Sequence, residues 1–117
     1  YHLRHSSKWI IRLGDGTAES HAKIQFAINN LWMFTEELFE MNKNDIQMAD
    51  QNIGVDCREL KPAWNKTVND IFAEATLKRP EDGHMTTGGR QGIHTEHLGH
   101  MLSDMQYLQR AYPDAKW

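Results

Sequence analysis

The sequence predicts an all-α protein built as an antiparallel helical bundle. Four segments have an apolar pattern that predicts a helix, most regularly residues 24–41, where apolar residues recur at alternating spacings of three and four. No segment shows the strict alternation of apolar and polar residues that is typical of a half-buried strand. Polar or glycine-rich connections separate the segments, as expected where helices turn back on one another.

Length and composition limit the possible classes of protein. A chain of 117 residues normally forms one domain, so residues 1–117 are expected to belong to a single domain. The net charge of −3 and the scattered cations do not indicate a nucleic-acid partner. No stretch approaches the roughly 20 apolar residues that a membrane-spanning helix needs. The single cysteine, Cys57, is typical of a reducing compartment, and we expect a cytoplasmic protein.

The first predicted helix covers residues 1–13 and ends at Gly14, a position that favours a left-handed backbone. No N-cap precedes it, so the start of the chain resembles the middle of a helix. The second helix begins after the N-cap Thr17, with Glu19 near the positive end of its dipole, and runs to Met41. Its apolar face is too broad for one neighbouring helix to cover: Ile24, Ala27, Leu31, Phe34, Leu38 and Met41, widened by Ile28, Trp32 and Phe39.

A polar connection is predicted for residues 42–56. The third helix follows Pro62, which suits the first turn because it has no N–H. Residues 78–93 contain Pro80 and four glycines and predict a long loop. The fourth helix begins near His94 or Thr95 and ends before Pro113. The predicted core faces of the third and fourth helices are Leu60, Trp64, Val68, Ile71, Phe72 and Ala75, and Leu98, Met101, Leu102, Met105 and Leu108.

Histidines in a helical bundle raise the possibility of a metal site. Di-iron bundles use a Glu from each of two helices and a Glu-x-x-His pair from each of two others. The one acidic residue with a histidine three places later is Glu81, paired with His84, and this pair falls in the predicted loop. His97 and His100 are further candidate ligands beside His94 and Glu96, but no third ligand on another helix is identifiable. We therefore expect no metal site and no catalytic residue in this chain.

Two other features suggest contacts. The segment Thr87–Gly92 is rich in glycine, but it lacks the Gly-Lys-Ser/Thr ending of a phosphate-binding loop, so a tight turn is the preferred interpretation. Tyrosine and tryptophan are enriched at protein interfaces. The candidate interface residues are His94, Glu96, Tyr107, Tyr112 and Trp117. The alternative for Tyr107, Tyr112 and Trp117 is a frayed terminus.

Two long stretches and one short one resemble a known family. They are Tyr1–Arg4 with Arg12–Thr17, Leu31-Trp32 and Thr35–Phe39; Thr87–Gly99 with Met101-Leu102 and Met105–Arg110; and Glu74–Leu77 between them. Together they are similar to the structural member, known as the C component, of the phenylacetyl-CoA epoxidase (ring 1,2-monooxygenase) complex. One departure is His100, where the family pattern leads us to expect proline.

The resemblance implies a ferritin-like bundle whose first helices are absent from this sequence. It also implies a structural subunit that is not itself catalytic, has no cofactor, and acts in aerobic phenylacetate degradation. The expected partner is a related catalytic subunit that carries the di-iron centre and binds the aryl-CoA thioester, in a heterodimer that assembles further. Two alternatives remain open: a catalytic metal protein with most ligands in the absent half, and an unrelated helical adaptor with no exposed apolar stripe.

Overall fold

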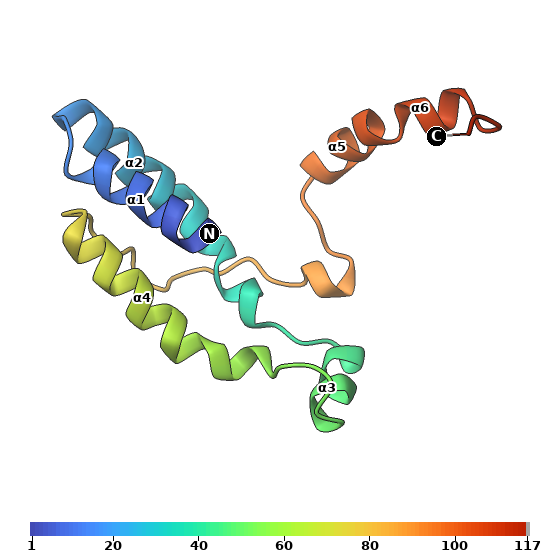
Figure 1. The fold of residues 1–117 in the computed structure, drawn as a ribbon, viewed down its shortest axis with the longest axis horizontal. Helices are drawn as coiled ribbons and strands as arrows, with labels where there is room; N and C mark the ends of the chain where they lie inside the picture. The colour runs from blue at the N-terminus through green and yellow to red at the C-terminus, as the bar shows by residue number, and fades with distance from the viewer. Residues whose placement is uncertain (117) are drawn as a thin grey trace. The chain divides into compact units, whose positions relative to one another are not determined.

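The computed structural model describes residues 1–116, and within that range every regular element is a helix (Figure 1). The predicted all-α class is confirmed. The chain forms two compact units, Tyr1–Thr87 and Gly88–Trp117. The expectation that residues 1–117 form one domain stays a prediction, and Trp117 lies outside the described residues.

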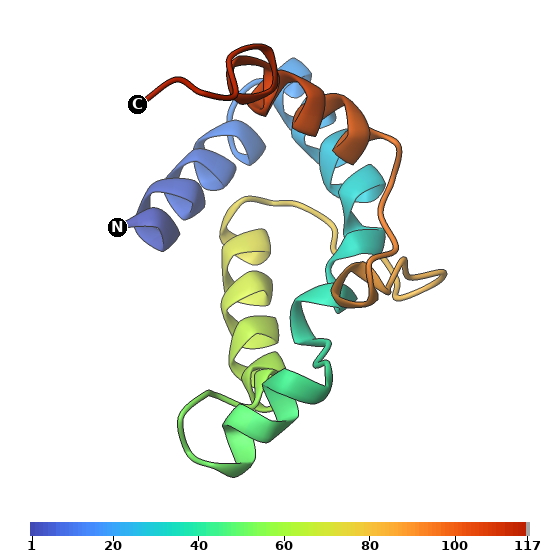
Figure 2. The same ribbon diagram turned by 90° about the vertical axis from the view of Figure 1, so that its right-hand side faces the viewer.

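Helices α1 (His2–Gly14) and α2 (Ala18–Leu31) form an antiparallel hairpin in the first unit (Figures 1 and 2). The predicted N-cap is confirmed, because the Thr17 hydroxyl oxygen accepts a hydrogen bond of 3.2 Å from the backbone N–H of Ser20. A second contact closes the turn: Nδ1 of His21 lies 2.7 Å from the carbonyl oxygen of Gly14. Side-chain contacts therefore fix both the start of α2 and its angle to α1.

Gly14 does not have the left-handed backbone that we predicted. It is the last residue of α1, and its importance lies in close packing against Ala75, which is fully buried. A Cβ at Gly14 would lie 2.4 Å from the Ala75 carbonyl oxygen and 2.9 Å from the Ala75 Cβ. The absence of a side chain at Gly14 is thus what allows the ends of α1 and α4 to meet.

The second helix is shorter than predicted. It ends at Leu31 and gives way to two 3₁₀ turns, η1 (Trp32–Phe34) and η2 (Glu36–Phe39), so the expected continuation to Met41 is wrong. The change of path places the Phe39 ring 5.4 Å from that of Trp64 and lets Glu36 form a 2.6 Å ion pair with Lys61. These tertiary contacts outweigh the local helical periodicity.

Residues 42–56, predicted as a polar connection, contain helix α3 (Lys43–Asp50). Its N-terminus is a capping box: the Asn42 side chain accepts from the Asp45 N–H, and the Asp45 carboxylate accepts from the Asn42 N–H. The helix ends at Asp50, and Asn52, two residues beyond, has a left-handed φ of 56°. Capping rather than an apolar stripe stabilises α3, which explains why hydrophobic periodicity did not reveal it.

A 3₁₀ turn, η3 (Cys57–Leu60), leads into α4 (Lys61–Glu74), and Pro62 occupies the first turn as predicted. The helix ends in a Schellman pattern, in which the Leu77 N–H donates to the Phe72 carbonyl and Thr76 takes a left-handed φ of 57°. Both views show α4 beside α1 (Figures 1 and 2). The buried cluster is Trp32, Phe72, Ala75 and Leu77, with Ile10, Ile11, Ile24, Ile28, Trp64, Val68, Ile71 and Met85 packed around it.

Residues 77–87, here called the return segment, run alongside α2 after α4 ends. The Gln25 side chain pairs with the backbone of Lys78, accepting from its N–H at 2.8 Å and donating to its carbonyl at 2.9 Å. Further along, the Thr86 N–H donates to the Met33 carbonyl at 2.8 Å. The predicted absence of a helix is confirmed here, and these bonds hold the segment in place.

Trp32 is enclosed by charged groups of the return segment as well as by the core. Its indole N–H donates to Asp82 at 2.9 Å, and the Arg79 guanidinium lies 4.8 Å from the centre of its ring. Arg79 also donates to the side chains of Asn65 and Asn69 on α4, each at 2.8 Å. One planar cation of the return segment therefore contacts both η1 and α4.

The second unit begins with a 3₁₀ turn, η4 (Gly89–Gln91), between two left-handed glycines, Gly88 and Gly92. The expected fourth helix starts later than predicted, at His97, and is divided into α5 (His97–Met105) and α6 (Tyr107–Ala111). It ends before Pro113, as predicted.

Replacing Gly14 by alanine should destabilise the first unit by about 1–3 kcal/mol, because the new Cβ would collide with the backbone of Ala75. Urea unfolding followed by circular dichroism measures the change. The matched control is Gly83→Ala, where a Cβ meets nothing within 4 Å. Equal stability of the two variants would contradict the proposed packing of Gly14.

Replacing Arg79 by lysine should lower the free energy of unfolding by about 1–2 kcal/mol, because an ammonium cannot stack on Trp32 and bridge two asparagines at once. Arg58→Lys is the control, since Arg58 is exposed and its ion pair with the neighbouring Asp56 should contribute little to stability. Thermal unfolding compares them. A loss no greater than that of the control would exclude the bridging role of Arg79.

Candidate subunit interface

The broad apolar face of α2 and the turns that follow it is only partly used by the core. Ile24, Ile28 and Trp32 pack inward, whereas Leu31 and Leu38, assigned to the core from the sequence, are 62% and 57% exposed. Phe26 and Phe34 are also exposed. An uncovered apolar surface of this kind on a folded unit usually marks a contact with another protein.

The apolar side chains of the second unit are also exposed, to a greater extent. Met101, Met105 and Leu108 all lie on the predicted core face of α5 and α6, yet Met105 is 66% exposed. None of the apolar residues described between 88 and 116 is fully buried. Helices of nine and five residues are marginal in water unless their apolar face is covered. Residues 88–116 thus have helices but no core of their own.

The predicted interface residues lie in this second unit. His94 precedes α5, Glu96 is its N-cap residue, Tyr107 opens α6 and Tyr112 follows it. All four are exposed, as an unbound interface requires. Whether they contact a partner stays a prediction.

The candidate metal ligands do not form a centre. His97 and His100 are both exposed on α5, and Glu81 and His84 are exposed in the return segment. In the part of the chain that the structure describes, no group of three or more His, Cys, Asp or Glu side chains is arranged to hold a metal ion. The described residues do not fit a di-iron site, which needs carboxylates and histidines that project together from facing helices.

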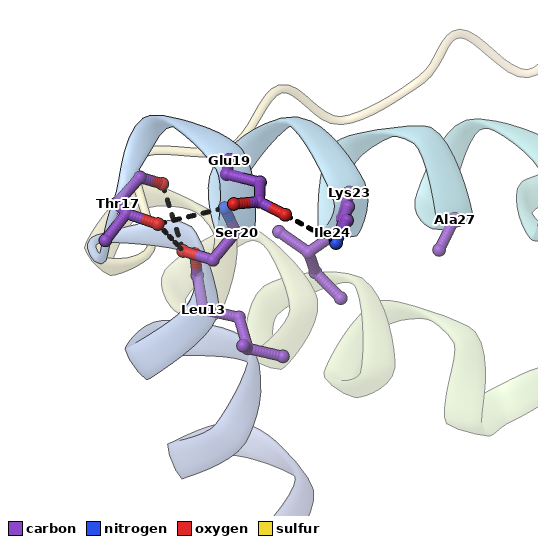
Figure 3. Close-up of a pocket in the computed structure, with 7 residues that line it drawn as sticks. All are labelled: Leu13, Thr17, Glu19, Ser20, Lys23, Ile24 and Ala27. Carbon is purple, nitrogen blue, oxygen red and sulfur yellow. Dashed lines mark hydrogen bonds and ion pairs between the residues drawn. The ribbon is translucent and has the colours of Figure 1, made fainter.

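A shallow depression of about 460 Å³ lies where α1 meets α2 (Figure 3). Leu13, Ile24 and Ala27 line its apolar side, and the exposed Glu19–Lys23 ion pair of 2.7 Å lies on its rim. The Ser20 hydroxyl, which also lines it, already donates to the Leu13 carbonyl at 2.8 Å. The depression offers apolar contact area but no set of converging catalytic groups.

Ionisable groups with shifted pKa values belong to exposed ion pairs. A hydrogen bond from Arg58 lowers the pKa of Asp56, and one to Asp70 raises the pKa of Lys66. Both pairs join neighbours on the surface, away from any cluster of acids and histidines. They stabilise local turns and do not resemble a proton-transfer site.

The helices of residues 1–116 include none that is both long enough and apolar enough to cross a membrane. This finding concerns the described helices alone.

Comparison with known proteins gives a family. The family described as "Phenylacetic acid catabolic protein" matches residues 1–117. A curated relative from Escherichia coli (strain K12), the C component of 1,2-phenylacetyl-CoA epoxidase, is 50% identical over 117 residues. The match covers 100% of this chain and 47% of the relative, so the chain spans about half the length of the curated relative it matches. The resemblance found in the sequence is confirmed, and the chain belongs to the phenylacetic acid catabolic protein family.

Proposed function

We propose that this chain is part of a non-catalytic structural subunit that binds and stabilises the di-iron catalytic subunit of a multicomponent phenylacetyl-CoA epoxidase. Its place would be aerobic phenylacetate degradation in the cytoplasm. The Escherichia coli relative is named as one subunit of such an epoxidase, which supports both the pathway and the presence of partner subunits.

The observation that carries the structural role is the uncovered apolar surface of α5 and α6. A fully buried Met or Leu side chain contributes about 1.5–3 kcal/mol relative to an exposed one. Met101, Met105 and Leu108 are at least half exposed within their own unit, so a partner that covers them would bury much new apolar area. The same partner would supply the core that residues 88–116 lack.

A structural role also suits the chemistry of the described residues. They offer no arrangement for a di-iron centre, which in this proposal belongs to the catalytic subunit. The contribution of this chain would be binding energy that keeps the partner's helices, and thereby the groups they carry, in position. Its own side chains would pack and orient the partner without making or breaking a covalent bond.

The double variant Met105→Asp/Leu108→Asp should bind the catalytic subunit about a hundredfold more weakly or worse, because two buried apolar contacts become buried charges. The measurement is the Kd of the intact protein for the purified catalytic subunit, by isothermal titration calorimetry.

Gln91→Asp/Gln109→Asp is the matched control, since it adds the same charge to the same unit at exposed polar positions. The melting temperature of each variant alone should be close to that of the wild type. If the Met105/Leu108 variant binds as tightly as the control, the α5–α6 face is not the interface. A wild-type protein that does not bind the catalytic subunit overturns the proposed function itself.

A further inference from the structure

Helix α1 carries an unbalanced row of cations. Arg4, Lys8 and Arg12 are spaced by four residues and are all exposed. Residues 1–14 contain no Asp or Glu, whereas the rest of the chain has 10 Lys and Arg (13 minus 3) against 16 acidic residues. The scattered distribution of cations expected from the sequence does not hold for α1. The four-residue spacing is the signal in the sequence that could have revealed this row. The surface that these cations form with the rings of Tyr1, His5 and Trp9 is called the basic α1 face.

Several other cations in the first unit are neutralised within the chain. Lys23 pairs with Glu19, Lys61 with Glu36 and Lys66 with Asp70, each at 2.6–2.7 Å. Among the described residues, no carboxylate lies within ion-pair distance of Arg4, Lys8 or Arg12. The positive charge of the basic α1 face is therefore not neutralised by the described residues and can pair with a group outside them.

Aromatic rings extend along the same face. The rings of Tyr1 and His5 are stacked with centroids 5.8 Å apart, and the His5 ring meets the edge of Trp9 at 6.4 Å. The Arg12 guanidinium lies 5.5 Å from the Trp9 ring centre. Trp9 is nonetheless 47% exposed and lines an open groove with His5, Lys8 and Arg12. Exposed Trp, Tyr and Arg side chains that are held in place are the residues that contribute most to protein interfaces.

The arrangement favours carboxylates of a protein over a bound phosphate. Arg4, Lys8 and Arg12 extend over about 12 Å of helix axis and do not converge on one point. A phosphate site needs several donors that converge, such as a backbone nest or a bidentate arginine fork. A row of this length matches acidic side chains spaced along a protein surface. Because Ile10 and Ile11 of α1 pack on the core, the basic α1 face points away from it.

We propose that the basic α1 face docks an acidic surface of the catalytic partner subunit, an inference that rests on the proposed function above. Charged contacts at an interface mainly accelerate and orient association, while apolar contacts contribute most of the affinity. The basic α1 face would accordingly steer the partner, and the apolar α5–α6 face would hold it.

The test uses the intact protein and the purified catalytic subunit. Arg4→Glu/Lys8→Glu should slow association about tenfold or more at low ionic strength and remove most of its salt dependence. Lys43→Glu/Lys116→Glu is the matched control, because it makes the same change in net charge at exposed lysines that form no ion pair with the described residues. The association rate of this control should remain within about twofold of the wild-type rate. The same is expected of the charge-conserving variant Arg4→Lys/Lys8→Arg. Stopped-flow association rates at two salt concentrations measure both effects, and circular dichroism verifies folding.

The outcomes separate the two proposals. If the wild type binds and Arg4→Glu/Lys8→Glu associates at the wild-type rate, the docking role of the basic α1 face is wrong and the structural function stands. If the wild type does not bind, both are wrong. If the charge reversal instead abolishes self-association, measured by analytical ultracentrifugation, the face serves a second copy of this chain and the proposal is overturned.

Discussion

The first unit depends on the burial of Trp32. Its ring lies among Phe72 and Trp64, with centroid distances of 6.0 and 5.8 Å, while its indole N–H is satisfied by Asp82. A buried tryptophan needs such a partner, because an unpaired N–H would cost about 1–3 kcal/mol. That requirement draws the return segment back along α2 and places Arg79 over the ring. Three elements distant in sequence are thereby joined around one side chain.

A consequence of this compact but small core is that much apolar surface remains outside it. Leu31 and Leu38 lie on the uncovered part of the face that begins with α2, and Met101, Met105 and Leu108 lie on α5 and α6. A chain with apolar surface in two separate units is suited to association, and the Escherichia coli relative is named as one subunit of an epoxidase. In the proposed docking, the cations of α1 would orient that association, because no described carboxylate pairs with them.

Hydrophobic periodicity predicted the all-α class and the helices α1, α2 and α4, because those elements bury a face in the core. It failed where other forces decide. The packing of Phe39 on Trp64 interrupts the second helix. Helix α3 has no apolar stripe and forms because Asn42 caps its N-terminus and Asn52 takes a left-handed backbone after its C-terminus. The left-handed backbone predicted for Gly14 was wrong. The reason for glycine there is its close approach to Ala75, which leaves no signal in a single sequence. Tyr107 and Tyr112 could be proposed for an interface from residue type, but exposure in the structure was needed to place Leu31, Leu38 and Trp9 on the surface.

The most direct test of the structural role is the iron and zinc content of the intact protein, purified alone without chelators and measured by inductively coupled plasma mass spectrometry. A structural subunit should contain far less than one metal ion per chain, while iron is found in the complex with the catalytic subunit. About two irons per chain in the protein purified alone would contradict the account, because that is the content of a complete di-iron bundle.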